Sequence, residues 1–319
     1  MRVPVSMLLL LACSGSSGSG TPTGGAPSVE RGSGEYTGML KVPAAEVNSG
    51  PRGAPMRPPP GQKPVVLPSF TCSETEVAAG ACPALAHSPL PSKVVRVAGF
   101  WIDETEVTRR AYGEFLAATG YRPPHVEEPW AEAEWNWDGP TPPAGTEDHP
   151  VVLTNWYDAR EYCAWRGARL PTEAEWQLAV LGAATTGTPW PWGTTYAEGL
   201  MNRGILAPPN YDAADGWRTT SPVGSFPGGA SRYGLLDGYG NVWEWVDTLR
   251  VRSWDEVRFD DPSTLTGPRT PLLGLYAGAR GFCYFVDPRP NLAMDYNACP
   301  VELRRKTSGF RCARSEPQP

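Results

Sequence analysis

Apolar residues recur at helical spacing in the middle of the chain. Residues 108–120, TRRAYGEFLAATG, place an apolar stripe from Ala111 to Leu116 on one face. Thr108 is a candidate N-cap at the start of this segment, and Gly120 is a candidate end. The pattern predicts a helix over these residues.

Two further segments, residues 155–167 (NWYDAREYCAWRG) and 171–182 (PTEAEWQLAVLG), have the same periodicity. In the second, Thr172 and Glu175 have the spacing of a capping box. Glu173 lies beside them and could form a catalytic pair with Glu175. Acids in a first turn usually serve the cap and the helix dipole, so we interpret both as structural.

Strands are harder to predict. Residues 92–103, SKVVRVAGFWID, alternate well enough to indicate one strand. The chain has 35 Gly and 36 Pro, which predict a body rich in turns and loops. All thirteen tryptophans lie between Trp101 and Trp254, and large aromatic side chains dominate core burial. We therefore expect the packed body to begin near residue 65.

The first 62 residues have a different composition. Residues 1–13, MRVPVSMLLLLAC, combine one basic residue with a short apolar run, which predicts a secretory signal. Ala12-Cys13 resembles a bacterial lipoprotein processing site, so we expect a mature chain lipidated at Cys13 and anchored in the cell envelope, on the periplasmic or outer-membrane face. The alternative is an ordinary signal peptide with a chance cysteine. Residues 14–62 are rich in Gly, Ser and Pro and are interpreted as a disordered tether.

The charge excludes one class of partner. The formal net charge is −6, and the sequence has no stripe of lysine and arginine. Nucleic acid is therefore not expected as a partner.

Five motifs occur in order along the chain: GFWIDETEVTRRAYGEF, HPVVLTNWYDAREYCAWRGARLPTEAEWQLAV, PWPWG, YGLLDGYGNVWEWVD and SGFRCAR. Together they resemble the formylglycine-generating enzyme family, also called sulfatase-modifying factors. The resemblance implies a domain over residues 63–315 with a mixed α+β, loop-rich fold, low in regular secondary structure and related to the C-type lectin fold. The family's usual opening strand has no clear counterpart in PVVLPSFTCSETEVAAGACP, so the start of the domain is diverged.

The resemblance also implies two calcium sites. Residues 235–245, LLDGYGNVWEW, combine acids, an amide and glycines, which suit a cation that takes six to eight oxygens. The same residues equally indicate plain turns. The family's ligands fall on two sets of residues. In the first set, the second and fourth residues would act through their backbone carbonyls: Asn202, Arg203, Asp215 and Trp217. In the second set, the middle two would do so: Asp237, Gly240, Val242 and Glu244.

Other metal sites find little support in the sequence. His87, His125 and His149 are isolated, and none pairs with a cysteine at zinc-ligand spacing. The three-histidine iron site of ergothioneine-type relatives also has no candidate residues.

Active members of the family bind Cu(I) through two cysteines about five residues apart and use it to convert a substrate cysteine to formylglycine. In this chain the corresponding positions hold Tyr284 and Arg289. Cys283 lies one position before the first of them, and the next cysteine is Cys299. Copper is therefore doubtful as a cofactor.

Six cysteines follow Cys13, and an exported chain folds in an oxidising compartment. The residues alone do not fix the pairing. The resemblance implies a disulfide between Cys163 and Cys312. We expect the remaining pairs to be the following: Cys72 with Cys82, and Cys283 with Cys299.

Three functions are compatible with this sequence. The first is an envelope-anchored binding or scaffold domain that lacks the oxidase chemistry and takes an exported protein or peptide as partner. The second is an active formylglycine-generating oxidase in which Cys283 and Cys299 form a rearranged thiol pair. The third is a carbohydrate-binding module, which rests on the analogy to lectins.

Overall fold

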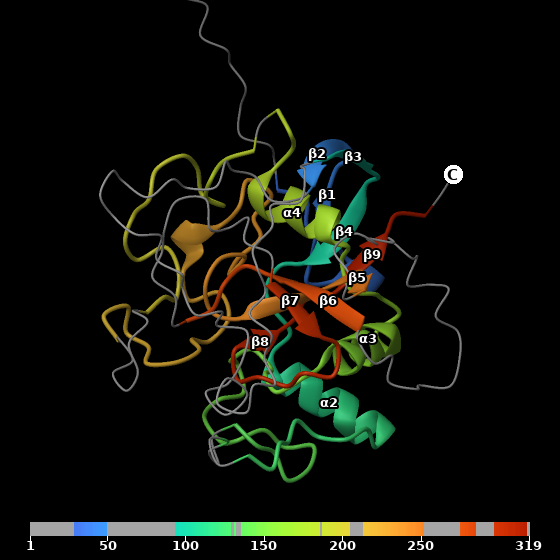
Figure 1. Cartoon of the computed structure of the whole chain (residues 1–319), viewed down its shortest axis with the longest axis vertical. Helices are drawn as coiled ribbons and strands as arrows, with labels where there is room; N and C mark the ends of the chain where they lie inside the picture. The colour runs from blue at the N-terminus through green and yellow to red at the C-terminus, as the bar shows by residue number, and fades with distance from the viewer. Residues whose placement is uncertain are drawn as a thin grey trace, which may run out of the picture.

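The computed structural model describes residues 29–49, 93–128, 131, 135–185, 187–204, 213–251, 275–284 and 297–317. Figure 1 shows small sheets and short helices joined by long loops. In chain order the elements are η1 (Gly34–Tyr36), β1 (Met39–Val42), β2 (Ala45–Ser49), β3 (Lys93–Val97), β4 (Phe100–Asp103), α2 (Arg109–Thr119), α3 (Trp156–Trp165), α4 (Glu173–Leu181), η2 (Pro227–Gly229), β5 (Trp243–Val251), β6 (Leu275–Arg280), β7 (Asn297–Pro300), β8 (Ser308–Gly309) and β9 (Ala313–Ser315). This is the mixed α+β, loop-rich architecture that the sequence predicted.

The strands form three sheets. A three-stranded sheet has the order β1-β4-β9, a two-stranded sheet pairs β2 with β3, and a four-stranded sheet has the order β7-β6-β5-β8. In the last sheet β5 and β8 are parallel and the other pairs are antiparallel. This sheet lies near the middle of the molecule in the view of Figure 1, with α2 and α3 below it and α4 above it. The loops that carry the candidate site lead into and out of its strands.

The three predicted helices are confirmed, with their predicted caps. Thr108 accepts a hydrogen bond from the Ala111 amide at the start of α2, and Gly120 ends it in the left-handed region at φ 65°. Thr172 and Glu175 form the capping box of α4. Glu175 takes part in the cap, as expected. Glu173 pairs with buried Arg280, and Glu175 with Arg169.

The start of the folded domain was predicted too late. Part of the segment assigned to the tether forms η1, β1 and β2, which pack into the body. Leu40 pairs with Ile102 across β1 and β4, and Val47 pairs with Val95 across β2 and β3. Leu40 and Val47 are fully buried. The surrounding Gly and Ser residues dominate the composition of this segment, so the two short strands are not apparent from it. Their aliphatic side chains pack into the core, although neither strand contains a tryptophan.

The single strand predicted over residues 92–103 is two strands that belong to different sheets. β3 pairs with β2, and β4 lies between β1 and β9. The break falls at Ala98 and Gly99, between the two strands. Alternation of apolar residues continues through the break, so periodicity alone gives no sign that the chain changes sheets.

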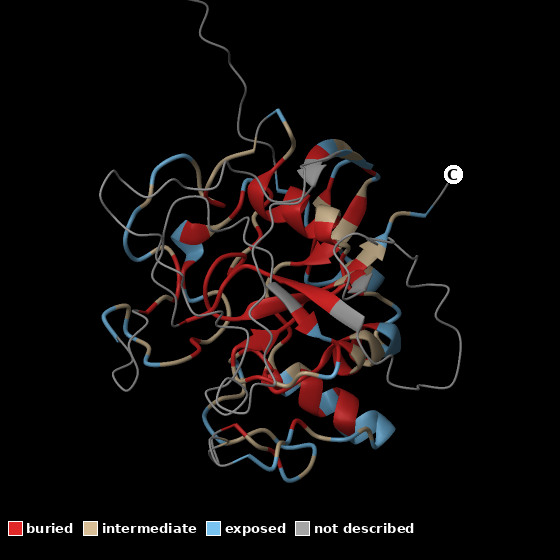
Figure 2. Ribbon diagram, viewed as in Figure 1, coloured by how far each residue is buried: buried red, intermediate tan, exposed pale blue. Residues whose placement is uncertain are grey.

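Figure 2 shows that the core runs through the centre of the molecule. Six tryptophans are among its largest fully buried side chains: Trp135, Trp137, Trp156, Trp176, Trp190 and Trp245. The predicted disulfide between Cys163 and Cys312 is present and joins α3 to the segment before β9, with Cα atoms 5.6 Å apart. Within the described residues, the helices are all too short or too polar to cross a membrane.

Candidate functional site

Three turns from distant parts of the sequence meet at Asn241. The Asn241 amide donates to the backbone carbonyl of Asn202 at 3.1 Å. The Asn241 carbonyl accepts the amide of Tyr284 at 2.9 Å, and the neighbouring Gly240 amide donates to the Gly281 carbonyl at 2.7 Å. Both predicted calcium loops and the cysteine-bearing turn are therefore parts of one region.

Gly240 allows the loops to approach so closely. Its φ is 91°, in the left-handed region that favours glycine. A Cβ at this position would lie 2.2 Å from the Asn202 carbonyl oxygen. Any larger residue would push the two predicted calcium loops apart.

The side chain of Asn241 extends the contact into the core. Its Oδ1 accepts hydrogen bonds from the Ser221 amide at 3.0 Å and from the Asn202 side chain at 3.2 Å. Its Nδ2 donates to Oε2 of Glu106 at 3.3 Å. Asn241 has a positive φ of 54°, which asparagine tolerates better than most residues. It thus connects four segments of the chain.

Glu244, a predicted calcium ligand, is fully buried in an ion pair with Arg311. Arg311 Nε lies 2.6 Å from Glu244 Oε2, and Arg311 Nη2 lies 2.7 Å from Oε1. Trp176 Nε1 also donates to Oε2, at 2.8 Å. Both carboxylate oxygens are therefore already hydrogen-bonded, and calcium at this loop would share them with Arg311.

Glu106 and Asp237 add two more buried carboxyl groups beside this pair. Burial raises the pKa of Asp237 to about 6, and the charge of Glu244 adds to the shift. Burial, and next the charge of Asp237, raise the pKa of Glu106 well above its ordinary value. Among the described residues, Arg311 is the cation that these carboxyl groups share. Asp237, Glu106 and Glu244 thus gather around one guanidinium, and a divalent cation beside them would favour their ionised forms.

Residues 202–204 and 213–217, the described parts of one predicted calcium loop, offer a cation an unsatisfied oxygen. Asn202 is buried, its Nδ2 donates to the Thr219 carbonyl at 2.8 Å, and its Oδ1 is buried without a hydrogen-bond donor. The carboxylate of Asp215 accepts the amides of Arg203 at 2.7 Å and Trp217 at 2.9 Å. These bonds hold Arg203, Asp215 and Trp217 next to one another. No group of three His, Cys, Asp or Glu forms a metal site within the described residues, so calcium would depend on amide and carbonyl oxygens.

The turn after β6 separates the side chains of Cys283 and Tyr284. Gly281 and Phe282, just before them, have φ values of 94° and 65°. Cys283 is buried in the main hydrophobic core. Tyr284 belongs to a second buried cluster, where its ring stacks on Trp135 with centroids 6.4 Å apart. A tyrosine anchored in the core thus occupies the position that the family resemblance assigns to the first copper ligand.

Cys283 and Cys299 are buried thiols, and the predicted disulfide between them is not formed. Cys299 lies opposite Ala277 in the pairing of β6 with β7. Cys299 therefore lies beside the middle of β6, and Cys283 lies past the turn at Gly281 that follows this strand. The Cys299 sulfur instead accepts a hydrogen bond from buried Arg305.

Several predicted residues lie outside the described part of the chain. They are Cys13, Cys72, Cys82, His87 and Arg289. Within it, His125 and His149 contact different partners, Asp138 and Thr220.

Three residues of this region were not singled out from the sequence: Glu106, Asn241 and Arg311. All three lie inside the motifs that resemble the family, in DETEVT, GYGNVW and GFRC. The motifs were therefore a signal that could have identified these three residues. Nothing in their spacing, however, indicates that residues so far apart in sequence contact one another.

The sequence profile described as "Sulfatase-modifying factor enzyme 1-like domain" matches residues 27–316. The chain belongs to this family. The match begins well before residue 63, in agreement with the early strands β1 and β2. It covers both predicted calcium loops and the turn that holds Cys283.

Individual relatives differ in the activity that their names state. The chain is 30% identical to a mouse (Mus musculus) protein named formylglycine-generating enzyme, over 70% of this chain and 68% of that protein. It is 36% identical to the mouse "Inactive C-alpha-formylglycine-generating enzyme 2", over 53% of this chain and 64% of the relative. Among solved structures it resembles PvdO from Pseudomonas aeruginosa, with a TM-score of 0.58 and 22% identity over 91% of this chain and 98% of that one. This last similarity concerns the fold.

Proposed function

We propose that this protein is a binding member of the sulfatase-modifying factor family that does not carry out copper-thiolate oxidation. The observation that carries the proposal is the position of Tyr284. A phenol ring stacked on buried Trp135 occupies the place of the first thiol ligand. A phenol does not replace a soft thiolate as a ligand for Cu(I).

The positions of the two cysteines support the same proposal. Two thiolates that share one copper ion must lie within a few ångströms of each other. Cys299 is held opposite Ala277 by the register of β6 and β7, and Cys283 follows the far end of β6. The two cysteines are thus sixteen residues apart on separate elements, whereas the family's thiol pair is about five residues apart.

The rival function is the oxidation of a substrate cysteine to formylglycine. One observation favours it, namely the contact between the Cys299 sulfur and the guanidinium of Arg305. A neighbouring cation stabilises a thiolate, which is the reactive and metal-binding form of cysteine. Cys299 is fully buried, however, so a substrate would reach it only after a rearrangement.

Anaerobic Cu(I) titration, followed by measurement of oxygen uptake with a cysteine-containing sulfatase-motif peptide, tests the proposal. We expect no stoichiometric copper binding by the native protein and no peptide-dependent oxygen uptake, with the mouse formylglycine-generating enzyme as positive control. Binding of one copper ion that is lost in Cys283→Ser and Cys299→Ser, together with peptide oxidation, would establish the rival.

Calcium is proposed as a structural ion of the region around Asn241. The orphaned Asn202 Oδ1 and the cluster of buried carboxyl groups beside Asp237 support it. Asn202, Arg203, Asp215 and Trp217 would hold one ion, and Asp237, Gly240, Val242 and Glu244 the other. When bound, the ions would hold together the loops that Asn241 already connects.

Export and lipid anchoring at Cys13 complete the proposal and rest on the sequence of residues 1–13. The partner would be an exported or envelope protein or peptide. Replacement of Cys13 by serine should move the protein from the membrane fraction to the soluble fraction or block its maturation. An unchanged membrane fraction in the variant would contradict the anchor.

A further inference from the structure

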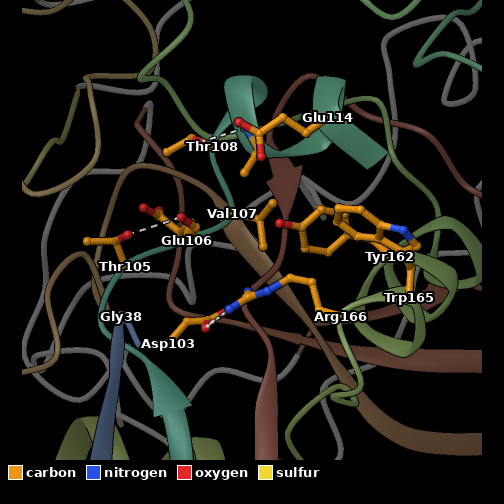
Figure 3. Close-up of a pocket in the computed structure, with 11 residues that line it drawn as sticks. Gly38, Asp103, Thr105, Glu106, Val107, Thr108, Glu114, Tyr162, Trp165 and Arg166 are labelled. Carbon is orange, nitrogen blue, oxygen red and sulfur yellow. Dashed lines mark hydrogen bonds and ion pairs between the residues drawn. The ribbon is translucent and has the colours of Figure 1, made fainter. Parts of the chain in front are cut away.

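A groove of about 400 Å³ lies between the start of α2 and the end of α3. Figure 3 shows Tyr162 and Trp165 of α3 on one side and Glu106 on the other, with Glu114 of α2 above and Asp103 and Arg166 below. Neither the calcium loops nor the turn at Cys283 contributes to its lining. We propose that this groove binds an organic cation, the ammonium or guanidinium group of a basic side chain on a partner polypeptide.

Trp165 gives the groove an exposed aromatic wall. Its side chain is 43% exposed, although most tryptophans of this protein for which burial is described are at least half-buried. The ring is held in place by Tyr162, at 5.8 Å between centroids, and by Phe115, at 5.6 Å. A fixed, partly exposed indole attracts cations through its π face.

The groove carries more negative than positive charge. Arg166 forms a bidentate pair with Asp103, with nitrogen–oxygen distances of 2.8 and 3.1 Å, so these two charges cancel. Glu114 remains as an exposed carboxylate on α2. Glu106 is only 2% exposed, and its Oε1 has no hydrogen-bond donor. An N–H group of a ligand would satisfy this acceptor.

The start of α2 does not provide an anion site in the groove. Helix N-termini bind anions through amides that lack partners. The amides of Arg109 and Arg110 donate to the carbonyls of His149 and Glu147, and the Ala111 amide donates to Thr108 Oγ1. At the other wall, the C-terminal end of α3 favours positive charge. Both helix ends therefore agree with a cation as ligand.

This inference rests on the proposed binding function and names the chemistry of the group bound. Small probe molecules test it, and no sulfatase-motif peptide is used. A failure of this inference is therefore distinguishable from a positive result of the copper experiment, which would overturn the proposed function. N-acetyl-arginine amide and N-acetyl-lysine amide would be titrated into the full chain by calorimetry, with N-acetyl-glutamine amide as the neutral comparison. We expect saturable binding of the cations in the millimolar range or tighter, and none of the neutral probe.

Variants locate the binding. Glu114→Gln and Trp165→Ala alter exposed side chains and should each weaken the binding of the cations about tenfold. Glu302→Gln removes the same charge from an exposed position that does not line the groove, and should leave the affinity within about twofold. Melting curves check that each variant is folded. Equal binding of neutral and charged probes, equal effects of Glu114→Gln and Glu302→Gln, or no saturable binding to the wild type would each overturn the proposal.

Discussion

Arg311 contacts both carboxylate oxygens of Glu244 in the interior of the domain, and neither side chain is exposed to solvent. Arg311 also donates to the carbonyls of Asp103, Glu104 and Leu236. One guanidinium thus joins β5 to the segment that follows β4 and to the loop before Asp237.

Removal of one partner of this pair should destabilise the fold strongly. Glu244→Gln removes the carboxylate that pairs directly with buried Arg311, and we expect a loss of about 3–5 kcal/mol in the free energy of unfolding. Urea denaturation measures it. Asp148→Asn removes the partner of Arg110 from an exposed ion pair and should cost less than about 1 kcal/mol. Similar losses in the two variants would mean that the buried pair is not a main support of the structure.

Much of the local structure followed from the sequence, because its causes are local. The caps of α2 and α4 depend on residues three or four positions apart, and the helices begin and end where Thr108, Gly120 and Thr172 predicted. The ion pair of Glu244 with Arg311 and the hydrogen bonds of Asn241 depend on tertiary contacts between distant residues. No periodicity encodes such contacts, and they were not predicted.

The early strands and the cysteines show a second limit of prediction from the sequence. β1 and β2 are short and lie among Gly, Ser and Pro residues, so composition averaged over the segment conceals them. For Cys283 and Cys299, cysteine parity and compartment favour a disulfide, but the pairing of β6 with β7 decides which residues can meet.

The contribution of His149 to stability should fall below neutral pH. Burial, and next the charge of Arg109, lower the pKa of His149 from 6.5 to about 4. The folded state therefore binds fewer protons than the unfolded state between these values. The contribution of His149 to stability is complete above about pH 6.5 and is lost as the pH falls towards 4. Urea titrations between pH 7.5 and 5 should show a smaller loss in His149→Gln than in the wild type.

His125→Gln is the matched control for this experiment, since His125 is an exposed histidine elsewhere in the chain. Its pH dependence should follow that of the wild type. If His149→Gln also follows the wild type, His149 is not the source of the loss.

Calcium removal should lower the melting temperature. A ligand that binds only the folded state at one hundred times its Kd stabilises it by about 2.7 kcal/mol, which corresponds to a shift of several degrees for a domain of this size. Asp215→Asn and Asp237→Asn should each reduce the effect of a chelator. Asp138→Asn, at a side chain that is 98% exposed, should leave it unchanged. A wild-type melting curve that does not respond to the chelator would contradict calcium at both loops.

The state of Cys283 and Cys299 can be read from alkylation with and without denaturant. Both thiols are buried, so iodoacetamide should label neither in the native protein. After denaturation without a reductant, both should be labelled, whereas Cys163 and Cys312 should remain protected by their disulfide. Peptide mapping by mass spectrometry distinguishes the four residues. A Cys283–Cys299 disulfide would leave all four unlabelled after denaturation, and would restore the pairing expected from cysteine parity. Rapid labelling of Cys299 in the native protein would instead indicate that its thiolate, beside Arg305, is accessible, and would favour the oxidase over the binding protein.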